Sequence, residues 1–323
     1  MLTGWSVLSS APEVGARQRE AGPVNTSGAM FEAERPRLQG LAYRMLGSLA
    51  DAEDAVQEAW IRWSRIDPAT IVEPRAWLVR VTTRLCIDRL RSLKARREDY
   101  VGPWLPEPLV EAADLSEPPP GEAMERAEDL TVAFLLALER LSPLERAVFV
   151  LHDLFSTDYS EVAAMLGRSE AACRQLGARA RAHVEAARPR YRLDEAEAKR
   201  LTEAFLEALR SDDAGRLGAL LAEDAVLVSD GGGKAVAALR PILGRDRIVR
   251  FLIGLSSKLA ARGRLEVKPA HVNGLPGLVV RAVNGLTTFA LETGEDGLVS
   301  AVYSVRNPDK LKRVAPLDAP RSS

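Results

Sequence analysis

The pattern of hydrophobic and polar positions divides the chain into two helical stretches and one strand-rich stretch. Apolar residues recur at helical spacing over residues 30–98, and again over residues 126–193. Beyond them, a helix over residues 194–209 precedes six short apolar and β-branched runs, which Gly, Asn and Asp separate as they do in hairpins. The pattern predicts a multidomain fold: two all-α modules followed by an α+β module with an antiparallel sheet.

Three segments lack such a period. Residues 1–29 are rich in Gly, Ala, Ser and Pro, so we expect a disordered lead; the sequence leaves open whether translation starts at Met1 or Met30. Residues 99–125 hold six prolines, a density that forbids a helix and predicts a linker. The third module is expected over residues 194–315, with a flexible tail over 316–323.

Composition is that of an ordinary globular protein. The chain has 323 residues, of which 46% are hydrophobic and 28% charged, so collagen-like and wholly disordered classes are excluded. Two distant cysteines, Cys86 and Cys173, argue against a disulfide framework or a zinc site and fit a reducing cytoplasm. No run of 18 apolar residues suits a membrane, and we expect neither a metal nor a cofactor.

The net charge of −1 conceals strong local charge. Residues 75–97 carry eight basic residues and one acidic residue, and residues 166–193 carry seven arginines and two glutamates. Between them, residues 98–129 carry ten acidic residues and one basic residue. Two basic helices suit a protein that contacts nucleic-acid phosphates at two places, although solvated helix faces explain such runs equally well.

The first helical module contains two recognisable helix starts. Ser48 opens a helix in which Val56, Trp60 and Trp63 share one face, opposite a mostly acidic polar face. Pro74 suits the first turn of the next helix. There the arginines lie outside an apolar stripe, so this helix could pack inward and face nucleic acid outward.

The second helical module contains a candidate helix-turn-helix. A short helix ends at Gly167, and Ser169 is a good N-cap for a basic helix over residues 170–185. In this motif the first turns of the second helix meet base edges in the major groove. Side chains suited to bases or phosphates there are Ser169, Glu170, Arg174, Gln175, Arg179 and Arg181. An ordinary αα-hairpin is the alternative.

The third module offers few groups for acid–base catalysis. The candidates are Asp230, His271 and, less suitably, Asp224. Asp230 precedes three glycines, which predicts a tight turn, and His271 lies on a strand-like run, where we expect a buried histidine. We therefore expect no catalytic residue.

Together, the blocks at 46–63, 74–92 and 141–184 resemble domains two and four of an extracytoplasmic-function (ECF, group 4) RNA polymerase sigma factor. Three further motifs are YVGPWLPEPL at 100–109, DGGGK at 230–234 and NPDKL at 307–311. They resemble motifs of the SigJ-like subgroup, whose members carry a fused C-terminal SnoaL-like (NTF2-like) domain. This fold is a curved sheet with helices that encloses a cone.

The resemblance implies two partners, the clamp and flap regions of core RNA polymerase and promoter DNA. The surface for polymerase would comprise Asp51, Asp54, Gln57 and Glu58. The −10 promoter element would be read by Arg75, Trp77, Arg80, Arg84, Arg89 and Arg91, and the −35 element by the helix at 170–185. The acidic linker would thread through polymerase between the two.

The resemblance also implies an intramolecular contact of the C-terminal domain with the sigma domains. Its residues would be Trp104, Pro106, Asp230, Gly231, Gly232, Gly233, Lys234, Asn307, Pro308, Asp309, Lys310 and Leu311.

Three functions follow from these observations. The first is a cytoplasmic promoter-specificity subunit without enzymatic activity, controlled by its fused domain. The second is a helix-turn-helix regulator whose cone senses a small apolar ligand, although a repressor needs no module with an acidic face. The third is a cyclase or isomerase fused to a DNA-binding arm, and fold alone is a poor warrant for it.

Overall fold

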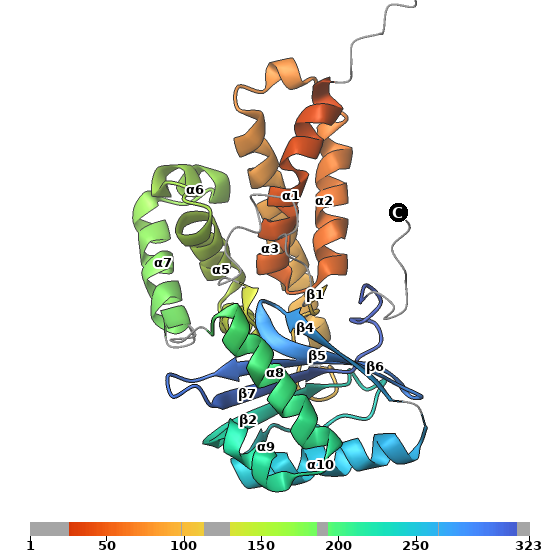
Figure 1. Cartoon of the computed structure of the whole chain (residues 1–323). Coiled ribbons are helices and arrows are strands. Elements are labelled where there is room, and N and C mark those ends of the chain that lie inside the picture. Colours follow the sequence, from red (N-terminus) through yellow and green to blue (C-terminus); the bar gives the residue numbers. More distant parts are fainter. Residues whose placement is uncertain (1–25, 98, 113–129, 186–192, 264, 315–323) are drawn as a thin grey trace, which may run out of the picture.

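The first helical module is a bundle of three helices. The computed structural model describes residues 26–97, 99–112, 130–185, 193–263 and 265–314. Figure 1 shows α1 (Thr26–Leu46), α2 (Leu49–Trp63) and α3 (Pro74–Arg97) side by side at the top of the molecule, with a short 3₁₀ turn, η1 (Pro68–Thr70), before α3.

The bundle starts earlier than the sequence predicts. The expected lead over residues 1–29 is too long, because α1 already begins at Thr26. Its first turn is held in place by Trp63, whose Nε1 donates a 2.8 Å hydrogen bond to the carbonyl oxygen of Ser27. Trp63 is fully buried and belongs to the apolar face predicted for α2.

The second helical module consists of α4 (Val132–Glu139), α5 (Pro143–Phe149), the π-helical turn η4 (Val150–Leu154), α6 (Tyr159–Leu166) and α7 (Glu170–Glu185). Helices α6 and α7 form the helix-turn-helix that the sequence predicted. Gly167 ends α6 at a φ of 64°, and the Ser169 hydroxyl accepts a 3.2 Å hydrogen bond from the amide of Ala172.

The two helical modules share one hydrophobic core. Arg146 of α5 is buried where they meet and donates to the carbonyl oxygen of Met45, at 2.7 Å, and to Glu139 Oε1, at 2.8 Å. Burial lowers the pKa of Arg146. The two modules are therefore packed against each other rather than held apart.

The C-terminal domain is a seven-stranded sheet with three helices on one face (Figure 1). The helices are α8 (Glu195–Arg210), α9 (Ala214–Leu220) and α10 (Arg245–Ala261). The strand order is β1 (Val110–Ala112), β4 (Glu266–Val272), β5 (Leu275–Ala282), β6 (Gly285–Thr293), β7 (Val299–Val305), β2 (Leu221–Asp230) and β3 (Ile242–Leu243).

This sheet departs from the prediction in two ways. It is mixed rather than antiparallel, because the meander β4–β7 returns to β2 and its last strand pairs with β2 in parallel. The apolar run over residues 235–242 is largely a loop rather than a strand, and it exposes Val236 and Leu239. The fold class itself, two helical modules followed by an α+β domain, is confirmed.

The predicted linker is partly built into the sheet. Its strand β1 pairs antiparallel with β4, with Val110 opposite Val272. The rest of the predicted linker, residues 113–125, lies outside the described part of the chain, as do residues 126–129 and the expected tail.

The two faces of the sheet have different neighbours. On one face, side chains of α8–α10 such as Phe205 and Leu252 pack onto Leu278 and Leu291. The opposite face packs Val279 and Tyr303 against residues from outside the sheet, namely Leu105, Val132 and Leu311. The sheet therefore lies between its own helices and the helical modules.

Candidate functional site

A bridging segment, residues 100–109, lies between the first helical module and the sheet. Its Glu107 is 3% exposed, and its carboxylate accepts hydrogen bonds at the start of α2 from the amides of Leu49, at 2.8 Å, and Ala50, at 3.3 Å. The first amides of a helix have no partner within the helix, and its dipole favours a negative charge there. Glu107 is thus a capping group for α2 that comes from outside the module.

On its other side, the bridging segment is fastened to Asp230 at the end of β2. This carboxylate is fully buried and accepts hydrogen bonds from the Tyr100 hydroxyl (2.6 Å), the Leu105 amide (2.9 Å) and Lys310 Nζ (2.7 Å). The tight turn that the three glycines predicted is present, with Gly232 and Gly233 at positive φ, but Asp230 itself is the last residue of β2.

The DGGGK and NPDKL motifs meet at this point. A Cβ on Gly232 would lie 2.1 Å from Asn307 Nδ2, which itself donates a 3.0 Å hydrogen bond to the Tyr100 hydroxyl oxygen. An ion pair between Lys234 and Asp309 joins the motifs at the surface. Glycine at position 232 is therefore required by the close approach of Asn307.

Aromatic rings complete the junction. Lys310 Nζ lies 4.2 Å from the ring centroid of Trp104 and 5.1 Å from that of Tyr100. Burial, followed by the hydrogen bond to the Asp230 carboxylate, raises the pKa of Tyr100. Pro106 is buried in the same segment, and Leu311 packs with Leu105. Most of the expected regulatory residues thus lie at one junction, whereas Gly233 and Pro308 are exposed at its edge.

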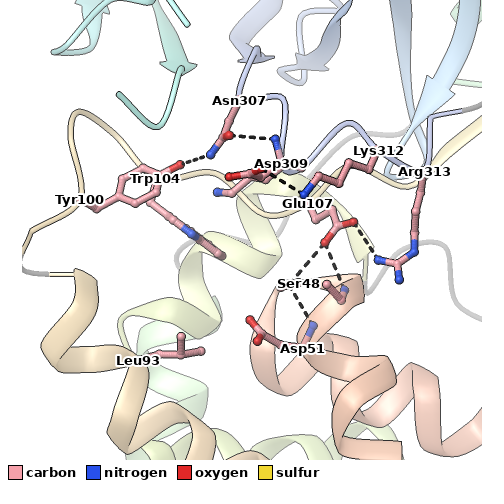
Figure 2. Close-up of a pocket in the computed structure, with 12 residues that line it drawn as sticks. Ser48, Asp51, Leu93, Tyr100, Trp104, Glu107, Asn307, Asp309, Lys312 and Arg313 are labelled. Carbon is pink, nitrogen blue, oxygen red and sulfur yellow. Dashed lines mark hydrogen bonds and ion pairs between the residues drawn. The ribbon is translucent and has the colours of Figure 1, made fainter. Parts of the chain in front are cut away.

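A pocket of about 480 Å³ lies in this junction (Figure 2). Its walls come from the start of α2, from Leu93 of α3, from the bridging segment, and from residues 307–313 that follow β7. Arg313 closes one side: it lies 3.3 Å from Glu107 Oε1 and also forms an ion pair with Glu53 of α2. The C-terminal domain therefore contacts α2 directly.

The four residues predicted to bind polymerase lie along α2 but differ in exposure. Asp54 is 72% exposed at its side chain, and Gln57 is also exposed. Glu58 pairs with Arg62 at 3.0 Å. Asp51 is turned toward α3, where Arg89 Nε donates a 2.9 Å hydrogen bond to it.

The residues predicted to read the −10 element do not form one free surface. Arg84 Nε donates to the carbonyl oxygen of Met165 in α6, at 3.3 Å, and Arg89 is held by Asp51. The ring of Trp77 packs 5.5 Å from that of Trp63, and Arg80 is partly buried. Arg75 and Arg91 are mostly exposed and form ion pairs with Glu34 and Asp88.

The residues predicted to read the −35 element divide into two groups. Ser169, Glu170, Arg174 and Gln175 are exposed in the first turns of α7, where Arg174 pairs with Glu170. The other two arginines are held within the module: Arg179 lies 2.8 Å from Glu145, and Arg181 lies 2.9 Å from Asp153.

The acid–base candidates do not form a site. Asp224 is exposed, and the Asp230 carboxylate already accepts three hydrogen bonds. His271 lies on β4 opposite Glu111 and Pro276. His271 is half-buried, so the expectation of a buried histidine is wrong. Within the described ranges, no group of three His, Cys, Asp or Glu could hold a metal ion.

Several contacts in the junction were missed by sequence reasoning. The Tyr43 hydroxyl donates a 2.7 Å hydrogen bond to the carbonyl oxygen of Glu107 and accepts one of 2.9 Å from Asn273 Nδ2. Burial raises the pKa of Tyr43. These partners come from three segments far apart in the chain, so no local pattern could have found them. Glu107 itself lies inside the motif that pointed to the junction.

Comparisons with known proteins agree with these observations. Residues 30–96 match Sigma-70 region 2, and residues 131–184 match Sigma-70, region 4. The ECF RNA polymerase sigma factor SigJ of Mycobacterium tuberculosis is 42% identical over 296 residues, which cover 87% of this chain and 91% of SigJ. The probable ECF RNA polymerase sigma factor SigI of the same species is 33% identical over 288 residues, 88% of this chain and 94% of SigI.

A solved structure extends this likeness to the fold. The crystal structure of M. tuberculosis SigJ has a TM-score of 0.71 at 38% sequence identity and covers 88% of this chain and 98% of its own. The chain therefore belongs to the ECF sigma factors of RNA polymerase, as the sequence motifs predicted. No helix in the described residues is long and apolar enough to cross a membrane.

Proposed function

We propose that this chain is an alternative sigma factor that brings core RNA polymerase to promoters with −35 and −10 elements, and that its SnoaL-like domain holds it in a closed state. The observation that carries the proposal is the double attachment of the bridging segment. Glu107 caps α2, while the Asp230 carboxylate holds the same segment on the sheet. The polymerase-binding helix is thereby tied to the C-terminal domain.

The closed arrangement conflicts with the proposed roles of several residues. Arg313 pairs with Glu53, the neighbour of Asp54 on the proposed polymerase surface. Arg84, a proposed reader of the −10 element, is bound to α6 of the other helical module. Because one core joins the two helical modules, they must separate before they can read two promoter elements at once.

We propose two states that differ in this contact. In the closed state the domain covers one edge of α2 and holds the helical modules together. In the open state the bridging segment leaves the sheet and follows its expected path through polymerase. Polymerase, which binds only the open state, would shift the equilibrium by its differential affinity.

Our proposal also covers where the chain acts, its lack of enzymatic activity and a ligand in the cone. The chain acts in the cytoplasm, where polymerase is, and has no enzymatic activity of its own. A small apolar ligand in the cone stays a prediction. The rival function, a free-standing repressor, predicts tight promoter binding without polymerase, which the closed state disfavours.

The affinity of the full chain for core RNA polymerase tests the proposal. Arg313→Gln removes the contact with Glu53 and Glu107 and should raise the affinity about three- to tenfold, because partly exposed ion pairs contribute roughly 1 kcal/mol. The matched control is Lys312→Gln, since Lys312 pairs, among the described residues, with Asp309 of its own segment, at 3.1 Å. Equal affinities of both variants and the unaltered chain would contradict autoinhibition, and absence of any polymerase binding would contradict the sigma role.

A further inference from the structure

Helix α10 carries a stripe of basic side chains on the far side of the C-terminal domain. Residues 240–262 hold six basic residues and one acidic residue, Asp246. The near-zero net charge of the whole chain conceals this local concentration. Ile248, Val249 and Leu252 are buried against the sheet. The exposed residues Arg247, Arg250, Lys258 and Arg262 fall on the other side at helical spacing. Figure 1 shows α10 at the bottom of the molecule, away from α1–α3.

These four basic residues differ from most of the arginines that are proposed to contact promoter DNA. Arg75, Arg89, Arg174, Arg179 and Arg181 all have acidic partners in the closed molecule. Within the described residues, Arg247, Arg250, Lys258 and Arg262 form no such ion pair. Gly254 lies in the middle of the stripe, and a Cβ there would meet nothing within 4 Å, so the surface is open.

Helix energetics do not explain the stripe. Cations are favourable near a helix C-terminus, where Lys258 and Arg262 lie, but unfavourable in the first turn, where Arg247 lies. Four cations on one exposed face also repel each other. An external polyanion would offset both effects.

We propose that this stripe binds the phosphate backbone of duplex DNA, a proposal that rests on the proposed role at promoters. Arg247 and Arg262 are 15 residues apart, about 22 Å along the helix. One strand of duplex DNA carries about six phosphates over such a length. Charge complementarity and length thus match a duplex, and the contact would be independent of base sequence, since it is made to phosphates.

The test is the salt dependence of the affinity of the full chain for a 60-base-pair duplex. Each lost phosphate contact should lower the slope of log affinity against log salt by about 0.9. The triple variant Arg247→Gln, Arg250→Gln, Lys258→Gln should therefore lose about 40-fold less affinity between 50 and 200 mM salt than the unaltered chain. The double variant Arg247→Lys, Arg250→Lys keeps the charge and should keep the slope.

The matched control neutralises three exposed basic residues of α8, namely Lys199, Arg200 and Arg210. An unchanged slope in the α10 variant overturns the proposal, as does a control variant whose slope falls by the same amount. Vesicles containing phosphatidylglycerol serve as a second probe, and loss of vesicle binding with an unchanged DNA slope would also overturn it. Run-off transcription with the same variants separates the two proposals: the sigma role fails only if no promoter-specific start is seen.

Discussion

At the scale of single residues, Asp230 is the most consequential side chain of the junction. Three donors converge on its buried carboxylate, among them the ammonium of Lys310. Removing one partner of a buried ion pair leaves the other charge uncompensated, which costs roughly 3–5 kcal/mol. The contact is thus strong enough to keep the bridging segment on the sheet, and a change here should open it.

Asp230→Asn should therefore lower the free energy of unfolding by about 3 kcal/mol. The matched control is Asp224→Asn on the same strand, where the side chain is exposed and the change should stay within about 0.5 kcal/mol. Denaturant unfolding of both variants measures the difference. Similar values for the two would mean that the Asp230 contacts contribute little to the closed state.

Some residues of the junction could be predicted from the sequence and others could not. The motifs around Trp104, Asp230 and Asn307 pointed to an interdomain contact, and all three residues lie in it. The capping role of Glu107 and the contact between Tyr43 and Asn273 depend on how separate segments meet in space. The ion pair between Arg89 and Asp51 joins a residue that the family resemblance assigned to promoter DNA with one that it assigned to polymerase.

At the scale of elements, the packing of α6 on α7 explains why a glycine stands inside a recognition helix. Glycine in a helix interior costs about 1 kcal/mol relative to alanine. At Gly177, however, a Cβ would lie 2.5 Å from the Tyr159 hydroxyl oxygen. Tyr159 also accepts a 3.1 Å hydrogen bond from Arg181, so it is not free to move aside.

Gly177→Ala should therefore destabilise the chain by about 1–3 kcal/mol, as overpacking does, in spite of the gain in helix propensity. Gly254→Ala in α10 is the control and should have the opposite effect on stability. A Cβ there would meet nothing within 4 Å, so the substitution should stabilise the chain by up to about 1 kcal/mol. Thermal unfolding of both variants checks the pair. A stabilising Gly177→Ala would show that α6 and α7 are packed more loosely than described.

Elements were predictable where the period of apolar residues was long and unbroken. Helices α7 and α8 follow their predicted ranges closely, and α2 and α3 begin where Ser48 and Pro74 predict. Strand β1 was missed because the prolines just before it, at positions 103, 106 and 108, indicated a linker, and because its partner β4 lies more than 150 residues away. The parallel pairing of β2 with β7 likewise depends on topology that hairpin signals do not carry.

At the scale of the whole molecule, the C-terminal domain and the bridging segment pack against the helical modules, as the proposed closed state requires. The sheet is covered on one face by its own helices and on the other by Leu105, Val132 and Leu311. Removing the whole domain would expose Leu105 and Val132, which pack on that second face, and would remove the contacts that hold the bridging segment and its Glu107 in place. A point change in the junction is therefore a cleaner way to open the molecule than a truncation.

Run-off transcription with core RNA polymerase on a library of genomic promoters measures both promoter-specific initiation and its restraint by the C-terminal domain. The full chain, Asp230→Ala and the control Asp224→Ala are compared at equal concentration. We expect transcripts that start downstream of a shared −35 and −10 pair, with several-fold more transcript from Asp230→Ala and no change for Asp224→Ala. Equal yields from all three would contradict the lock, and the absence of any promoter-specific start would contradict the sigma factor.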